Sequence, residues 1–293
     1  MTNLRRLEWY ARHLSLPLTV PAGGAVEACR AAARGRGIRF AALREYEYGD
    51  DVRTIDWNAT ARFARPFVKT FEEDRGVDLL ILVDCSASLG DATNSASKAA
   101  IARELAAIFI LVGLRQEQRT SLVLFTDRIE LSVPLLRGRD HARRLVQKLD
   151  RTAVTSRRTD LSLALRQVPR LLPHPGLVLL ISDFAVECHE RDLGAVARRH
   201  DVFALALVDP SEAEPPDVGL VRARDIETGR IRWLDTGGGP ARDRFRSAWL
   251  TWQRDQRELF RRAGAARTEI KIRDPYFPTL RAACRTFQMR RTR

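Results

Sequence analysis

The stretch VDLLILVDCSAS, Val77 to Ser88, decides the fold class. Its residues up to Asp84 form a nearly continuous apolar run bounded by charge, which is typical of a central strand covered on both faces. A carboxylate and two hydroxyls follow at alternate positions, in Asp84, Ser86 and Ser88. In an open parallel sheet, ligands bind beyond the carboxyl ends of the strands. The stretch therefore predicts an α/β domain with a ligand site after this strand.

Beyond this stretch, buried apolar runs alternate with segments of helical periodicity. Such alternation implies a mostly parallel sheet with right-handed crossovers and helices on both faces. The runs from Thr120 to Thr126 and from Ile129 to Pro134 are joined by two residues and predict a hairpin, so the second run is expected to be antiparallel. We expect one six-stranded sheet, with strands at 77–84, 120–126, 129–134, 177–182, 202–208 and 268–272.

The rest of the chain predicts two additions to this sheet. Residues 1–76 are less regular and are expected to form an N-terminal appendage packed on a main domain of residues 77–293. After a Pro- and acid-rich break, residues 218–235 predict a two-stranded hairpin. A long amphipathic helix follows, so that the insertion of hairpin and helix occupies about 211–263.

Composition places the chain among ordinary globular proteins. It has 293 residues, of which 45% are hydrophobic and 30% charged, enough to bury a core without a disulfide or metal staple. The longest apolar run, Leu105 to Leu114, is about half the roughly 20 residues that a membrane-spanning helix requires. We find no signal-peptide pattern and no C-x-x-C pair among the four cysteines. These features predict a cytoplasmic protein with no membrane span.

The net charge of +13 raises the question of a polyanionic partner. The basic residues comprise 46 arginines and four lysines, and they are scattered along the whole chain. Scattered charge affects association and solubility more than it indicates a specific activity. A basic protein that binds nucleic acid or another polyanion stays the alternative function, with nucleic acid the disfavoured partner.

Further oxygen ligands are expected where neighbouring strands end. Asp183 ends the strand predicted to lie beside the first one, and Thr159 opens the helix before it. Oxygen ligands in a small octahedral arrangement suit Mg²⁺ or Mn²⁺. A polar loop whose serines merely cap a helix is the alternative. The candidate metal ligands are Asp84, Ser86, Ser88, Thr159 and Asp183.

These five positions resemble the metal-ion-dependent adhesion site of von Willebrand factor A domains. The shared pattern is DxSxS after the first strand, a Thr that opens a later helix and an Asp that ends the fourth strand. In that family the two Ser and the Thr coordinate the cation, and the two Asp do so directly or through water. An acidic side chain of the partner protein often fills the open position. The resemblance therefore implies metal-dependent protein binding.

A longer resemblance covers most of the chain. The stretch GRGIRFAALREYEYGDDVRTIDWNATARFARPFVKTFEEDR, residues 35–75, runs into VDLLILVDCSAS and resembles the bacterial family called domain of unknown function 58. DIETGRIRWLDT, further on, agrees as well. Members of that family couple such a segment to a von Willebrand factor A-like domain and are commonly encoded beside MoxR-type AAA+ ATPases. The resemblance implies an adaptor or co-chaperone that binds such an ATPase or its client.

Enzymatic activity is not expected. The sequence contains no G-x-S-x-G elbow, no H-E-x-x-H and no G-x-x-x-x-G-K-[ST] loop. A phosphatase of the haloacid dehalogenase type would need a second Asp two residues after Asp84, where Ser86 stands. The segment Asp50 to Trp57, rich in acidic, basic and aromatic residues, is open to several interpretations: a docking surface, a contributor near the metal loop, or a buried ion-pair brace between appendage and main domain. We favour the brace.

Overall fold

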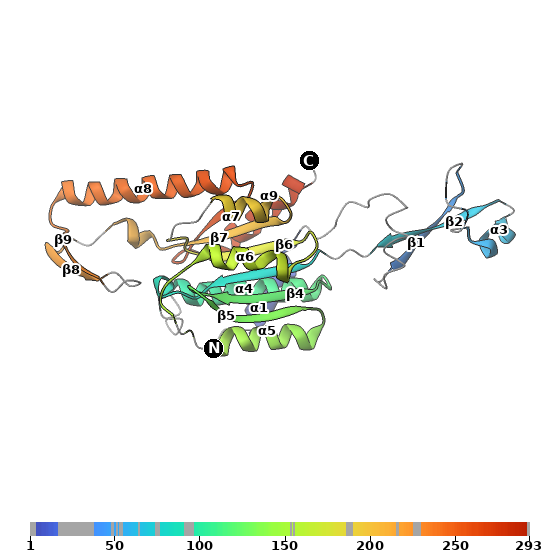
Figure 1. Ribbon diagram of the computed structural model, residues 1–293, viewed down its shortest axis with the longest axis horizontal. Coiled ribbons are helices and arrows are strands. Elements are labelled where there is room, and N and C mark those ends of the chain that lie inside the picture. The colour runs from blue at the N-terminus through green and yellow to red at the C-terminus, as the bar shows by residue number, and fades with distance from the viewer. Residues whose placement is uncertain are drawn as a thin grey trace. The chain divides into compact units, whose positions relative to one another are not determined.

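The chain divides into two compact units in the computed structural model. One unit comprises Met1–Pro17 and Val77–Arg293, and the other comprises Leu18–Gly76. Figure 1 shows the elements of both. The structure describes residues 4–16, 38–47, 50, 52, 55–63, 65–73, 77–90, 97–152, 154, 156–185, 190–214, 217–224 and 230–291.

The larger unit is built on a six-stranded sheet with the strand order β10-β7-β6-β3-β4-β5. All neighbouring strands are parallel except β4 and β5, which are antiparallel. Leu179 of β6 pairs with Ile81 of β3, so the two predicted buried runs share one sheet. The predicted α/β fold with a mostly parallel six-stranded sheet is thus confirmed. The strands are β3 (Leu79–Asp84), β4 (Thr120–Phe125), β5 (Ile129–Leu136), β6 (Leu177–Ser182), β7 (Asp201–Val208) and β10 (Ala266–Lys271).

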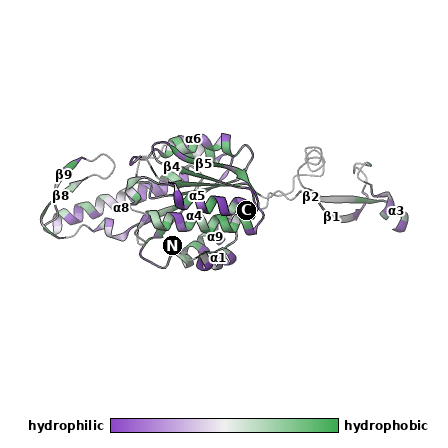
Figure 2. Cartoon of the chain, turned by 90° about the horizontal axis from the view of Figure 1, so that it is seen from below, coloured by the Kyte–Doolittle hydropathy of each residue, from purple (hydrophilic) through white to green (hydrophobic). Residues whose placement is uncertain are grey.

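Helices cover both faces of this sheet because its central strands are apolar on both sides. Every residue of β3, β4 and β6 is buried. Figure 2 shows β4 and β5 between α6 on one side and α4 and α5 on the other. On the second side, Phe109 of α4 and Phe287 of α9 both contact Phe203 of β7. The helices are α4 (Lys98–Arg115), α5 (Arg139–Arg151), α6 (Leu161–Leu171), α7 (Glu190–Ala197), α8 (Gly239–Arg262) and α9 (Tyr276–Arg291).

Helix α1 (Leu4–His13) falls within the predicted appendage of residues 1–76 but belongs to the larger unit. It packs beside α4 and buries Leu7 and Ala11. Arg6 forms an ion pair with Glu104 of α4 at 2.5 Å. The predicted appendage of residues 1–76 is therefore too long at its N-terminal end, because the apolar stripe of α1 needs α4 for its burial. Packing of the remaining appendage on the main domain stays a prediction.

The smaller unit contains an antiparallel pair, β1 (Ile38–Glu45) and β2 (Phe67–Glu73), and the short helix α3 (Trp57–Phe63). Asp56 caps α3, since its carboxylate accepts backbone N–H bonds from the first turn. Asp50 pairs with Arg44 at 2.7 Å, and the Trp57 side chain is exposed. These contacts lie within the unit itself, so the brace to the main domain stays a prediction. Outside the described residues lie Asp51 and Arg53.

The predicted insertion follows β7. A short 3-10 helix, η3 (Pro210–Ala213), leads to the antiparallel hairpin of β8 (Leu220–Arg224) and β9 (Ile231–Asp235), and then to α8. Phe260 is buried near the C-terminal end of α8, whereas Phe245 near its start is 43% exposed. Within the part of the chain that the structure describes, no helix has both the length and the apolar character that crossing a bilayer requires.

Candidate metal centre

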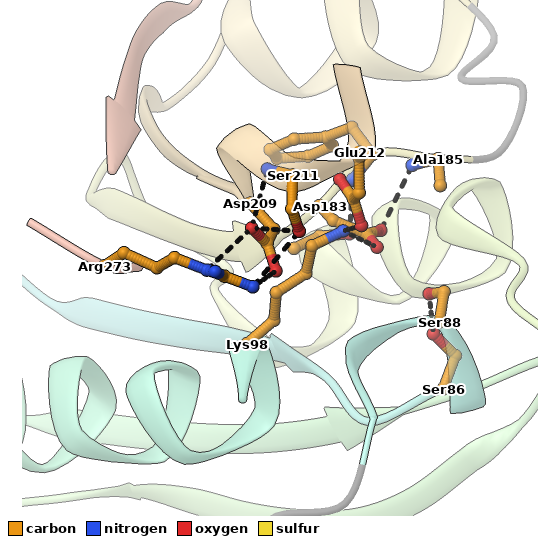
Figure 3. Close-up of polar contacts among 11 residues, drawn as sticks. Ser86, Ser88, Lys98, Asp183, Ala185, Asp209, Ser211, Glu212 and Arg273 are labelled. Atoms are coloured by element: carbon orange, nitrogen blue, oxygen red, sulfur yellow. Dashed lines mark hydrogen bonds and ion pairs between the residues drawn. The ribbon is translucent and has the colours of Figure 1, made fainter. Parts of the chain in front are cut away.

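The loop after β3 gathers three of the predicted ligands. Asp84, the last residue of β3, is buried, and its Oδ1 accepts the backbone N–H of Ser86 at 2.8 Å. This bond to the second residue onward is an Asx turn, which a short Asp side chain favours. Ser182 donates its hydroxyl to the other carboxylate oxygen at 2.6 Å. The Oγ atoms of Ser86 and Ser88 lie 2.9 Å apart, and a dashed line marks this contact in Figure 3. The loop therefore brings its oxygen atoms together.

Asp183 directly follows β6, the parallel neighbour of β3. Parallel neighbours end at the same edge of a sheet, so Asp183 and Asp84 meet there. The Oδ1 atom of Asp183 accepts the backbone N–H of Ala185 at 3.1 Å. Its Oδ2 atom accepts a hydrogen bond from Lys98 Nζ at 3.0 Å. Both predicted carboxylates are thus at one edge and nearly excluded from solvent.

The two carboxylates interact electrostatically. Burial, and after it the charge of Asp183, raises the pKa of Asp84 to about 7, while hydrogen bonds from Ser182 and Ser86 oppose the shift. Desolvation and a neighbouring like charge both disfavour the ionised carboxylate. A cation placed between the carboxylates would relieve both effects. This cost of ionisation is what a divalent ion would remove.

Thr159 lies on a loop that is hydrogen-bonded to the metal loop. The backbone N–H of Ala87 donates to the carbonyl of Arg157 at 3.1 Å. The backbone N–H of Asp160 donates to the carbonyl of Thr126, just after β4, at 3.0 Å. Asp160, and not Thr159, is the N-cap of α6. Thr159 is half-buried and lies two residues before the helix, in a segment that reaches the predicted edge of the sheet. Its neighbour Asp160 caps the helix instead.

Ser86 of the metal loop does not serve as a side-chain helix cap. Ser86 precedes the short helix η2 (Ala87–Leu89) but makes no side-chain capping bond. The next described helix, α4, is capped by Ser97, whose Oγ accepts the backbone N–H of Ala100 at 3.1 Å. The capping interpretation of the loop is therefore wrong for Ser86. Its hydroxyl, with that of Ser88, stays at the edge of the sheet.

The donor set fits a hard divalent cation. Carboxylate and hydroxyl oxygens are the donors that Mg²⁺ and Mn²⁺ take in proteins. Among the described residues, no group of three or more His, Cys, Asp or Glu side chains is arranged to hold a metal. A cation here would consequently depend on hydroxyls and water beside the two carboxylates. The residues that would hold it are Asp84, Ser86, Ser88, Thr159 and Asp183.

Sequence reasoning missed three side chains at this edge: Ser182, Lys98 and Glu212. Ser182 is buried and orients Asp84 through its hydroxyl. Lys98 contacts Asp183, and Glu212 of η3 contacts Lys98. One signal pointed to Lys98, because it is one of four lysines among 50 basic residues and opens the helix after the metal loop. The position of Glu212 has no comparable local signal.

Lys98 carries its charge in a nearly buried position. The residue is 7% exposed. Burial opposes the charged form, but the carboxylates of Asp183 and Glu212 outweigh it and raise the pKa of Lys98 above its ordinary value. The ammonium group is therefore a fixed positive charge beside a candidate metal ligand.

Cys85 is next to Asp84 but is not a nucleophile of the thiolate type. Burial, followed by the charge of Asp84, raises the pKa of its thiol to about 12. The thiolate is the reactive form of cysteine, and a thiol with this pKa stays protonated at neutral pH. Cys85 therefore contributes packing at this edge.

The family of the chain follows from comparison with known proteins. The model of a family described as protein of unknown function DUF58 matches residues 42–258. The chain belongs to this family. The DUF58 chain is 32% identical over 235 residues to Rv1480, an uncharacterized protein of Mycobacterium tuberculosis, and the match covers 79% of this chain and 74% of that protein.

Solved structures to which this DUF58 chain aligns have low sequence identity to it. BatB, a conserved hypothetical protein from Bacteroides thetaiotaomicron, aligns with a TM-score of 0.47 at 11% identity, over 73% of this chain and 100% of that chain. The VWA domain of SpRpn10 aligns with a TM-score of 0.37 at 10% identity, over 70% of this chain and 94% of that chain. Both are likenesses of fold.

Proposed function

We propose that this DUF58 chain is a metal-dependent protein-binding module. Its site consists of Asp84, Ser86, Ser88, Thr159 and Asp183 and takes Mg²⁺ or Mn²⁺. The observation that carries the proposal is the meeting of two buried carboxylates, Asp84 and Asp183, at adjoining strand ends, with a pair of serine hydroxyls in the loop beside them. Such a group is costly without a cation and well matched to one.

Each residue of the site would have a different role in binding a partner. A bound cation would supply positive charge and an open coordination position for a carboxylate of another protein. Asp84 and Asp183 provide the negative charge, and the hydroxyl groups provide neutral oxygen atoms. Ser182 keeps Asp84 oriented through its hydrogen bond. An Asp or Glu of the partner then completes the coordination, and the surrounding loops provide the remaining contact area.

We further propose that the chain contributes no catalytic turnover. In the described part of the chain, the serine hydroxyls at this edge hydrogen-bond each other or Asp84, and none of them hydrogen-bonds a histidine. The thiol of Cys85 is held protonated. An activated thiol has a lowered pKa, and an activated serine most often has a histidine base, so the described side chains at this edge match neither arrangement. Binding is the use that the arrangement favours.

The family resemblance supports a particular class of partner. DUF58 proteins are commonly encoded beside MoxR-type AAA+ ATPases, so the proposed partner is such an ATPase or its client. The chain would then act in the cytoplasm as an adaptor or co-chaperone. An acidic side chain of that partner would meet the site.

Capture of a purified MoxR-type AAA+ ATPase by the immobilised chain tests this proposal. We expect capture in millimolar Mg²⁺ and its loss in EDTA or with Asp84→Asn, which removes one ligand charge with little change in size. The matched control is Asp140→Asn, an exposed acid at the start of α5, which should capture like the wild type. Capture that persists in EDTA and with Asp84→Asn would contradict the metal-dependent latch. If that capture also vanished at high salt, the polyanion-binding alternative would be favoured.

A further inference from the structure

A buried ammonium group lies beside the candidate metal centre. Lys98 is the first residue of α4, and its Nζ lies 3.0 Å from Asp183 Oδ2. The same ammonium forms an ion pair with Glu212 of η3. Figure 3 shows the side chain reaching from α4 to both carboxylates. One lysine thus bridges a candidate metal ligand and an acid from a different part of the fold.

Lys98 and a divalent cation would compete for the same carboxylate. Asp183 has two carboxylate oxygens with which it could bind a cation. Lys98 contacts one of them, Oδ2, and the other accepts the backbone N–H of Ala185. A positive charge this close also repels a second cation, and burial weakens the screening of that repulsion. Lys98 is therefore expected to lower the affinity of the site for a divalent ion.

Glu212 offers Lys98 a second carboxylate when Asp183 is taken. Its segment is held in place, because Asp209 caps η3 and pairs with Arg273 at 3.2 Å. The Glu212 side chain is 45% exposed, so it can keep its charge in contact with water. A buried ammonium with no acceptor would be strongly unfavourable. Glu212 thus makes the release of Asp183 less costly.

We propose that Lys98 is a positioning residue that governs occupancy of the metal centre. In the metal-free protein it neutralises Asp183, and when a divalent cation binds it transfers its interaction to Glu212. This inference rests on the proposed metal-dependent function. It assigns opposite effects to two residues of one ion pair: Lys98 weakens cation binding, whereas Glu212 strengthens it by drawing Lys98 away. Because the Lys98 ammonium opposes binding of the divalent ion, a further carboxylate from a partner would help to retain that ion.

Titration of the purified chain with Mn²⁺, followed by electron paramagnetic resonance of the free ion, tests the proposal. We expect Lys98→Met to lower the Mn²⁺ dissociation constant about tenfold or more, since it removes an adjacent positive charge. Glu212→Gln should raise the constant, on the order of threefold to tenfold, since Lys98 then has only Asp183. In the double variant the Glu212→Gln effect should disappear, because Glu212 acts through Lys98.

The matched control is Arg128→Met, which removes one positive charge just after β4, at the same edge of the sheet. Arg128 is 59% exposed at its side chain and pairs with Asp127 instead of a candidate ligand. We expect a change of less than about twofold, because an exposed charge is screened by water and salt. If this control lowered the Mn²⁺ dissociation constant as much as Lys98→Met does, the effect would be one of general electrostatics. That result would overturn the specific role of Lys98.

The remaining outcomes separate this inference from the proposed function. Mn²⁺ binding by the wild type that Lys98→Met does not tighten would overturn the inference and leave the metal centre standing. No Mn²⁺ binding by the wild type or any variant would overturn both. If Glu212→Gln still weakened Mn²⁺ binding in the Lys98→Met background, Glu212 would be a direct ligand. Its action through Lys98 would then be refuted. Should Lys98→Met fail to fold, an unchanged affinity in Glu212→Gln alone would overturn the inference.

Discussion

Burial shifts the pKa values of single residues in this protein more than exposed charges do. His200 lies just before β7 and is 4% exposed, and neither of its ring nitrogens has a hydrogen-bond partner among the described residues. Burial, and after it the charge of Arg199, lowers the pKa of His200 to about 4. The folded protein therefore keeps this ring neutral at pH values at which an unfolded chain would protonate it.

We predict an acid-sensitive contribution of His200 to stability. Between its unfolded pKa of about 6.5 and its folded pKa of about 4, the unfolded state binds the extra proton, so the free energy of unfolding falls as the pH falls. At pH 5 this loss amounts to about 2 kcal/mol relative to pH 8. Urea unfolding of wild type and His200→Asn at both pH values measures it, because the variant lacks the titrating group.

The control for this prediction is His174→Asn, which replaces an exposed histidine. It should show the same pH dependence of unfolding as the wild type. Equal pH dependence in the wild type and His200→Asn would show that the pKa of His200 does not differ between the folded and unfolded states.

Helices in the larger unit owe their places to tertiary burial and to their caps. Helix α1 is ten residues long, shorter than the roughly 12 to 15 residues at which an isolated helix becomes marginally stable in water. Leu7 is 2% exposed and α1 packs beside α4, so this packing provides the stability that such a short helix lacks in isolation. Helix α6 instead begins at a cap, where Asp160 Oδ1 accepts the backbone N–H of Leu163 at 2.8 Å.

We predict that Leu7→Ala lowers the free energy of unfolding of the larger unit by about 2 to 4 kcal/mol, as a buried leucine does when it leaves a cavity. Urea denaturation followed by circular dichroism measures the change. Glu8→Ala, on the exposed side of the same helix, should change it by less than about 0.5 kcal/mol. An equally small effect of Leu7→Ala would place α1 outside the cooperative unit.

We predict that Asp160→Ala lowers the free energy of unfolding by about 1 kcal/mol through loss of the α6 cap. Asp160 also lies 3.8 Å from Arg166, but exposed ion pairs of this kind contribute little. Arg166→Ala therefore serves as the comparison and should have the smaller effect in the same thermal or urea unfolding measurement. A larger effect of Arg166→Ala would favour the ion pair over the cap.

For the whole molecule, the proposed metal centre couples cation binding to folding. An ion that binds only the folded state stabilises it by mass action, by about 2.7 kcal/mol when the free ion is at one hundred times its dissociation constant. Asp84 and Asp183 approach each other only in the folded chain, since 98 positions separate Asp84 from Ser182, the residue before Asp183. The unfolded chain has no comparable site.

We predict that Mg²⁺ or Mn²⁺ raises the melting temperature of the wild type but not that of Asp84→Ala. Differential scanning calorimetry in millimolar cation and in EDTA measures the shift. Asp140→Ala, which alters an exposed acid away from the site, should respond like the wild type. Equal shifts in the wild type and Asp84→Ala would refute a specific site at these residues.

Much of the fold was predictable from local pattern. The run from Leu79 to Asp84 and its counterpart from Leu177 to Ser182 are apolar throughout because both faces of a central strand are covered. The short separation between Phe125 and Ile129 likewise determined an antiparallel neighbour. With the strand order restricted by right-handed crossovers, the adjacency of Asp84 and Asp183 followed from the sequence.

Only the tertiary structure decided which further side chains surround that edge. Lys98 meets Asp183 across 85 positions and meets Glu212 from a turn beyond β7, and neither contact leaves a periodic trace in the sequence. Helix α1 likewise joined the larger unit through packing on α4, although it was predicted to belong to the appendage. Periodicity reports whether a segment has a buried face. Which other side chains cover that face depends on long-range packing, and this is why the counterion of the candidate metal centre emerged only in three dimensions.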